Sequence, residues 1–115
     1  MGRPKEIWRD DFERAVARGE KIAASDRNGM ILDCACLRGH LVCDEKRVLG
    51  AGWLEFIEPQ DDLPRILSWF TRDDESEPIT YKQLCQKDGK PVISYITLVK
   101  RKYGQTWLCY GAVRP

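Results

Sequence analysis

The sequence predicts an α+β fold in which a five-stranded antiparallel sheet carries helices on one face and an N-terminal flanking helix precedes it. Three observations predict this. Two predicted strands stand before a central helical region, and three strands rich in β-branched and aromatic residues stand after it. Apolar residues recur at helical spacing in the N-terminal segment and again in residues 63–70. Short turns rich in Gly, Asn and Asp link neighbouring strands, which favours antiparallel pairing.

Residues 4–18 are expected to form the flanking helix, with Pro4 in its first turn and Gly19 just past its end. One stripe of this helix is apolar. It consists of Trp8, Phe12, Ala15 and Val16. A stripe of this size has to be buried, either against the sheet of its own chain or against a second chain.

Residues 21–25 and 30–36 are predicted to form the first two strands. Asn28-Gly29 between them favours a tight hairpin turn. Residues 37–50 are ambiguous, although Asp44 would suit the start of a short helix that runs to Leu49.

Residues 63–70 are predicted to form the central helix, with Asp61 or Asp62 as its N-cap. Its apolar stripe comprises Leu63, Ile66, Leu67 and Phe70. Residues 79–86, 91–100 and 106–113 are the last three predicted strands, and turns at 87–90 and 102–105 connect them.

Several short motifs occur in the order found in one family. They are the first hairpin at residues 26–32, the Leu-Gly-x-x-Trp run at 48–53, the Pro-Gln-Asp-Asp run at 59–62, Asp-Gly at 88–89 and the closing Gly-x-x-Arg at 111–114. Together with the element order, they make residues 20–114 resemble a PAS domain. Two positions depart from the family pattern: Ala35 stands where Asn is frequent, and Glu58 stands where His is usual. The chain therefore resembles a divergent member.

The resemblance implies a division into a flanking helix at residues 1–19 and a PAS-like domain at 20–115. It implies a sensory module that binds a small apolar ligand or a partner, relays a conformational change and acts on a downstream domain or protein. The expected cavity lining is Cys34, Cys36, Trp53, Phe56, Ile66, Phe70, Ile96, Leu98, Trp107 and Cys109. The family often pairs through such an N-terminal helix, so a homodimer is expected with Trp8, Phe12, Ala15 and Val16 in its interface. The alternative is a purely structural dimerisation module with a filled core and no ligand.

The cofactor remains unknown, but two subclasses of the family are disfavoured. The segment that aligns with the flavin-binding motif of LOV domains, residues 50–57, has no Cys, and residues 63–70 contain no His for haem. A cluster of Cys34, Cys36, His40 and Cys43 has zinc-binding side chains but no standard zinc spacing, so we expect ordinary thiols and no metal site.

Composition excludes several other classes of function. The net charge of +1 leaves no basic field for nucleic acid, and no apolar run is long enough to cross a membrane. No signal segment is evident, so a cytoplasmic location is expected. No catalytic motif is present, and an enzyme is not expected. The run Lys100-Arg101-Lys102 is expected to be a solvated hairpin end.

Overall fold

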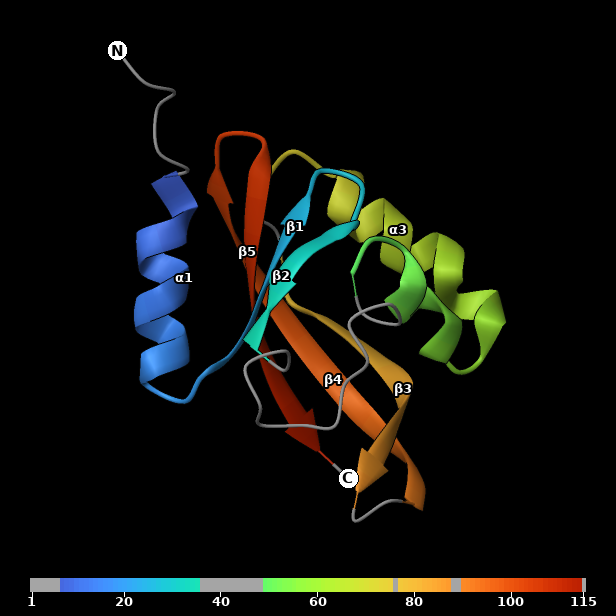
Figure 1. Cartoon of the computed structure of the whole chain (residues 1–115). Coiled ribbons are helices and arrows are strands. Elements are labelled where there is room, and N and C mark those ends of the chain that lie inside the picture. Colours follow the sequence, from blue (N-terminus) through green and yellow to red (C-terminus); the bar gives the residue numbers. More distant parts are fainter. Residues whose placement is uncertain (1–6, 36–48, 76, 88–89, 115) are drawn as a thin grey trace.

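A computed structural model describes residues 7–35, 49–75, 77–87 and 90–114 (Figure 1). The helices are α1 (Ile7–Ala17), η2 (Gly52–Phe56), η3 (Gln60–Asp62) and α3 (Leu63–Thr71). The strands are β1 (Lys21–Asp26), β2 (Ile31–Cys34), β3 (Ile79–Lys87), β4 (Lys90–Tyr103) and β5 (Thr106–Arg114). They form one five-stranded sheet in the order β2-β1-β5-β4-β3, with every described pairing antiparallel. The predicted fold class and strand order along the chain are confirmed, whereas the short helix predicted after Asp44 lies outside the described residues.

The β1–β2 hairpin forms at the predicted Asn-Gly turn. Asp26 Oδ1 accepts hydrogen bonds from the main-chain N–H groups of Asn28 and Met30, at 2.8 and 3.0 Å. Gly29 adopts φ of 85°, and a Cβ added there would lie 3.0 Å from the Phe70 ring. Glycine is therefore required at this position by both its backbone conformation and the close approach of α3.

Helix α3 begins at the predicted residue and has Asp62 at its N-cap position. The Asp62 side chain makes no capping hydrogen bond. Its carboxylate instead accepts two hydrogen bonds of 2.6 Å from the Arg65 guanidinium. Pro64 occupies the first turn, where its missing N–H is not needed. The buried face is Ile66, Trp69 and Phe70, so Trp69 joins the stripe that the sequence predicted.

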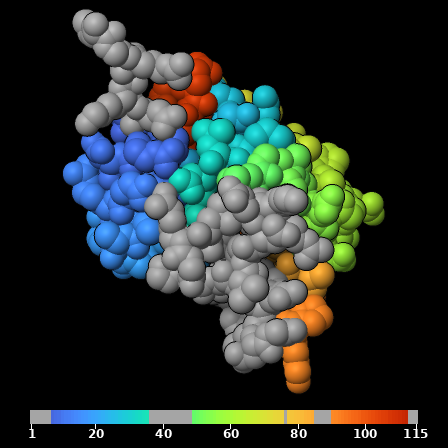
Figure 2. Space-filling model, viewed as in Figure 1, coloured from blue at the N-terminus to red at the C-terminus, as the bar shows by residue number. Residues whose placement is uncertain are grey.

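The sheet has a separate apolar cluster on each face. Helix α1 covers one face and α3 with η2 covers the other (Figure 1). In the space-filling view the surfaces of α1 and α3 lie on opposite sides of the molecule (Figure 2). Cross-strand neighbours share a face, because side chains alternate along a strand. On β5, Leu108 therefore faces α1, while Trp107 and Cys109 face α3.

The apolar stripe of α1 is buried against the chain's own sheet. Trp8 is 4% exposed, Phe12 and Ala15 are fully buried, and Val16 packs at the margin of the same cluster. The stripe meets Ile22, Ala24 and Leu108. This is the first of the two arrangements that the sequence allowed, and it leaves little of Trp8 or Phe12 to contact a second chain.

Polar contacts fix α1 on the sheet at two points. Tyr103 donates from its hydroxyl to Asp11 Oδ2 at 2.5 Å, and Arg9 binds Asp33 of β2 at 2.7 Å. The Arg9 guanidinium also lies 4.2 Å from the centre of the Trp8 ring. These contacts tie the helix to strands at both sides of the buried stripe.

Candidate functional site around helix α3

Most of the predicted cavity-lining residues meet in one buried cluster between the sheet and α3. Six of them belong to it: Trp53, Ile66, Phe70, Ile96, Trp107 and Cys109. Leu98 packs against the cluster, whereas Cys34 and Phe56 are half-buried. Cys36 lies outside the described residues. Sequence reasoning missed Trp69 and Tyr81, which are 5% exposed and complete the aromatic packing.

The indole groups of this cluster are tied to backbone carbonyls. Trp53 donates to Gly29 O at 2.9 Å, Trp69 to Glu77 O at 2.8 Å, and Trp107 to Phe70 O at 3.0 Å. Each large ring is thereby satisfied at its polar edge while its apolar body is buried. The rings also make edge-to-face contacts: the ring centres of Trp53 and Trp69 lie 5.6 and 4.9 Å from the centre of the Phe70 ring. Every buried member of this cluster is at most 7% exposed.

Lys100 is the unexpected member of the site. The sequence predicted a solvated residue at a hairpin end, but the side chain is 3% exposed. Its ammonium donates to the main-chain oxygens of Trp69 and of Arg72, the latter at 2.9 Å. The prediction was wrong because Lys100 lies two and four residues after Leu98 and Ile96 in β4, and so faces the same buried side.

The Lys100 ammonium caps the carboxyl end of α3. Carbonyls of the last turn lack helical donors and carry the negative end of the helix dipole, so a cation there is favourable. The Trp107 and Trp69 rings enclose the ammonium at 4.1 and 4.7 Å from their centres. No carboxylate lies within ion-pair distance of it among the residues described. Burial lowers the pKa of Lys100, and Asp74 opposes this shift through space.

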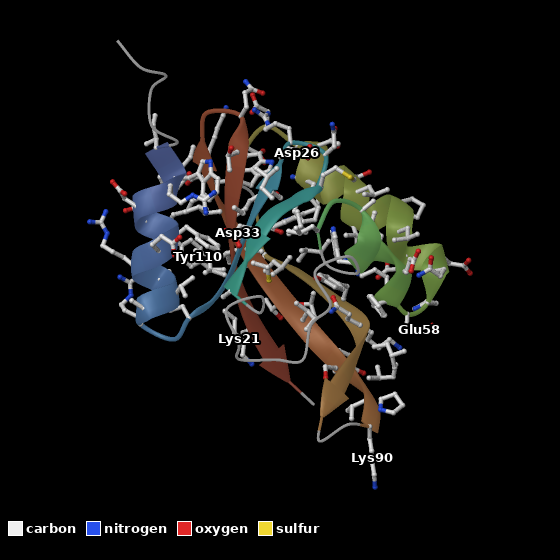
Figure 3. The ribbon with its side chains drawn as sticks, in the orientation of Figure 1. Lys21, Asp26, Asp33, Glu58, Lys90 and Tyr110 are labelled. Atoms are coloured by element: carbon white, nitrogen blue, oxygen red, sulfur yellow. The ribbon has the colours of Figure 1, made fainter. Side chains whose placement is uncertain are left out.

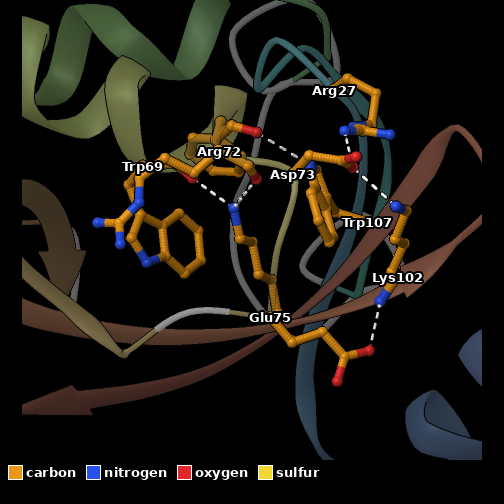
Figure 4. A network of polar contacts seen from close by, with 9 residues as sticks. Arg27, Trp69, Arg72, Asp73, Glu75, Lys102 and Trp107 are labelled. Atoms are coloured by element: carbon orange, nitrogen blue, oxygen red, sulfur yellow. Dashed lines mark hydrogen bonds and ion pairs between the residues drawn. The ribbon is translucent and has the colours of Figure 1, made fainter.

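A second set of polar contacts closes the same end of α3 at the surface (Figure 4). Asp73 pairs with Arg27 of the first hairpin turn and with Lys102 Nζ at 2.7 Å. Glu75 Oε1 accepts from the Lys102 main-chain N–H at 3.0 Å. The contact with Lys102 keeps the pKa of Asp73 below its usual value, with Arg27 contributing. The segment after α3 is thus joined to the β1–β2 turn and to β4.

Cys109 is the described thiol in the core. It is 2% exposed, and its Sγ lies 3.9 Å from the hydroxyl of Ser25 on the neighbouring strand. Burial raises the pKa of Cys109 to about 12. The thiol is therefore protonated at neutral pH and is a packing group rather than a nucleophile.

A cleft opens on the outer side of α3. Its volume is about 280 Å³, and its walls are Arg65, Ser68, Trp69 and Arg72 on the helix and residues 77–79 before and within β3. Arg65 donates to Thr80 O at 2.8 Å, and Trp69 donates to Glu77 O, so both walls are braced against each other. No feature of the sequence alone indicated this cleft.

The opposite face of β3 and β4 carries an exposed apolar patch beside α1. Four side chains make up this outer patch, each between 38% and 49% exposed: Leu84, Ile93, Tyr95 and Val99. Leu84 pairs with Ile93, and Val99 pairs with Tyr110. Tyr110 packs at the edge of the α1 cluster, close to that helix (Figure 3). Helix α1 covers the sheet over β1 and β5 but leaves this part open.

Comparison with known structures identifies the architecture. The PAS domain of an HTR-like protein from Haloarcula marismortui superposes with a TM-score of 0.54 at 18% identity, covering 91% of this chain and 96% of that one. The chain has the PAS fold. The RpfR quorum-sensing receptor PAS domain of Cronobacter turicensis, solved in complex with BDSF, gives 0.53 at 16% identity over 81% and 91% of the two chains. The PAS domain of BvgS from Bordetella pertussis gives 0.50 at 17% identity over 92% and 85%.

No protein-family model matches the chain, and the search of curated proteins found no match. A PAS fold at such low identity agrees with the divergent sequence pattern, including Ala35 and Glu58 in place of the usual residues. Of the predicted Cys and His cluster, only Cys34 lies within the described residues, so the zinc alternative stays untested. None of the helices in the described segments is long and apolar enough to span a membrane.

Proposed function

We propose that this chain is a non-catalytic sensory module of PAS type, in which a ligand or partner at α3 changes the sheet and thereby the pairing of two copies. One observation carries the proposal. Strand β4 presents Lys100 to α3 on one face and Tyr95 and Val99 to solvent on the other. A displacement of the α3 end therefore acts on the same strand that carries the outer patch.

The partner that pairs through the outer patch, as distinct from whatever binds at α3, is a second copy of the chain. The stripe of α1 is already covered by its own sheet, so the proposed interface moves to the outer patch and the adjoining edge of α1. Charges of both signs adjoin this surface: Lys82 and Arg101 are exposed on the strands, and Asp11 of α1 reaches Tyr103 of β4. A two-fold arrangement would place each patch against the α1 edge of the other copy and bury the exposed apolar side chains.

Sedimentation of purified protein tests the pairing. Wild type is expected to dimerise at high micromolar concentration, and a Tyr95→Glu, Val99→Glu variant is expected to be monomeric with an unchanged melting temperature. Gln105→Glu, an exposed change in the β4–β5 turn, serves as the matched charge control and is expected to remain dimeric. A monomeric wild type at several hundred micromolar would overturn the homodimer.

The relay from α3 to the patch needs its own measurement. Lys100→Met removes the ammonium on the buried side of β4, whereas Lys90→Met makes the same chemical change at the exposed far end of the same strand (Figure 3). Lys100→Met is expected to change the dimer dissociation constant at least fivefold, because it releases the α3 end. If both variants pair as wild type does, the sheet does not transmit the state of α3.

The purely structural alternative is also supported by a specific observation, the burial of three indoles next to α3 whose N–H groups all have partners. Native mass spectrometry of the purified protein separates the two functions. A co-purified small molecule supports the sensory module, while a ligand-free dimer whose pairing is insensitive to Lys100 supports the structural module. A cytoplasmic location and a separate output domain remain predictions.

A further inference from the structure

The cleft outside α3 contains two charges of opposite sign that the described residues do not neutralise. The charge of Arg65 is neutralised by Asp62, whose two carboxylate oxygens accept hydrogen bonds of 2.6 Å from the guanidinium. The Arg72 guanidinium and the Glu77 carboxylate have no hydrogen-bonding or ion-pair partner among the residues that the structure describes, although they line the same cleft. They lie on opposite walls, Arg72 at the end of α3 and Glu77 just before β3.

The two walls are held at a fixed separation. The Trp69 indole donates across the cleft to Glu77 O at 2.8 Å, and Arg65 donates to Thr80 O at 2.8 Å. The Ser68 hydroxyl adds a neutral donor one helical turn before Arg72. Pro78 and the edges of Trp69 and Ile79 supply the apolar part of the lining. A site with few polar groups on a braced scaffold, next to an apolar wall, is suited to a small molecule.

We propose that this cleft binds a small zwitterion, an α-amino acid with an apolar side chain. Its carboxylate would pair with Arg72 and Ser68, its ammonium with Glu77, and its side chain would lie over Pro78. A simple anion would meet the Glu77 carboxylate, and a simple cation would meet Arg72, so only a ligand with both charges satisfies both walls.

The position of the cleft connects it with the capped end of α3. Trp69 and Arg72 line the cleft, and their main-chain oxygens are the two acceptors of the Lys100 ammonium. A ligand that draws the Arg72 side chain toward Ser68 would therefore act on the same turn that Lys100 holds. In this respect the inference rests on the proposed sensory function and names its ligand class.

The test is a titration of ¹⁵N-labelled protein, followed at the indole N–H resonance of Trp69, which Trp69→Phe assigns. The probes are L-leucine, 4-methylpentanoate, which lacks the ammonium, and 3-methylbutylamine, which lacks the carboxylate. Leucine is expected to give saturable shifts with a dissociation constant of about 1 mM, as expected for a few-atom ligand in an open cleft. Each single-charge analogue is expected to bind about tenfold more weakly or worse, since a charge-assisted contact is worth about that factor.

Variants of the two walls sharpen the result. Arg72→Gln and Glu77→Gln are each expected to weaken leucine binding about tenfold or more. The double exchange of Arg72→Glu with Glu77→Arg keeps one charge of each sign and is expected to restore most of the affinity. Arg18→Gln, with the same loss of charge at the exposed end of α1 on the other face of the sheet, is the control that leaves binding unchanged.

Two outcomes would overturn the proposal. The first is the absence of a saturable shift at about 20 mM leucine, a concentration well above the expected dissociation constant. The second is that 4-methylpentanoate binds as tightly as leucine and that Glu77→Gln has no effect on leucine binding. Sedimentation with and without leucine keeps this result apart from the proposed function. If leucine binds while the dimer constant stays the same, the site is correct and the relay is not. If leucine does not bind but Lys100→Met still alters pairing, the relay stands and this ligand class is wrong.

Discussion

Replacing Lys100 with Met tests the role of the buried ammonium most directly. Methionine fills nearly the same volume and keeps the contact with the Trp69 and Trp107 rings, but it cannot donate to the oxygens of Trp69 and Arg72. The change therefore isolates the polar contribution from the packing contribution.

The expected loss follows from opposing effects. Two hydrogen bonds from a charged donor contribute about 1.5–3 kcal/mol each. The helix terminus and the two rings add about 1–2 kcal/mol. Removing the ammonium also removes the cost of burying it, which the lowered pKa of Lys100 indicates, and this offsets part of the gain. The free energy of unfolding should fall by about 2–3 kcal/mol at pH 7.

The assay is chemical denaturation of Lys100→Met beside Lys102→Met. Lys102 undergoes the same change on the same strand but loses only a half-exposed ion pair with Asp73, worth about 1 kcal/mol or less. Hydrogen exchange should show faster exchange in the last turn of α3 in Lys100→Met alone. Equal losses in the two variants, or a Lys100→Met protein as stable as wild type, would refute the capping argument.

Three further predictions follow from individual contacts. Gly29→Ala should lower the free energy of unfolding by about 2–4 kcal/mol, because φ is positive there and the new Cβ would lie 3.0 Å from the Phe70 ring. Gly104 also has a positive φ but has open space around it, so Gly104→Ala should cost only about 1–2 kcal/mol in the same denaturation assay. Folding raises the pKa of Cys109 from 9.0 to about 12, so the stabilisation from the buried thiol is complete below pH 9 and is lost as pH rises toward 12. Between those pH values, the free energy of unfolding of wild type relative to Cys109→Ala should fall by about 1.4 kcal/mol per pH unit. A stability difference that is flat from pH 8 to 11 would contradict this. Tyr103→Phe removes the hydrogen bond to Asp11 and should lower stability by about 1 kcal/mol with faster hydrogen exchange in α1; exchange that changes equally in α3 would mean that α1 is not held locally.

The sequence determined the elements and their order because these depend on local patterns. The alternation in β4 and the helical stripe of Ile66 and Phe70 act over a few residues, and the Asn28-Gly29 turn needs no distant partner. The family motifs added the PAS-like arrangement, which the sheet order β2-β1-β5-β4-β3 confirms. Six of the predicted cavity residues meet in the core for the same reason, since each lies on the apolar side of its element.

Tertiary structure decided what those side chains do. The stripe of α1 could be buried by either of two partners, and only the folded sheet shows that Ile22, Ala24 and Leu108 cover it. Lys100 has the charge of a surface residue and the strand position of a core residue. Its environment depends on where α3 ends, some thirty residues earlier in the chain, because the unpaired carbonyls there favour a buried cation. The cleft with Arg72 and Glu77 likewise exists only because α3 and the start of β3 pack side by side, a contact that no local pattern in either segment encodes.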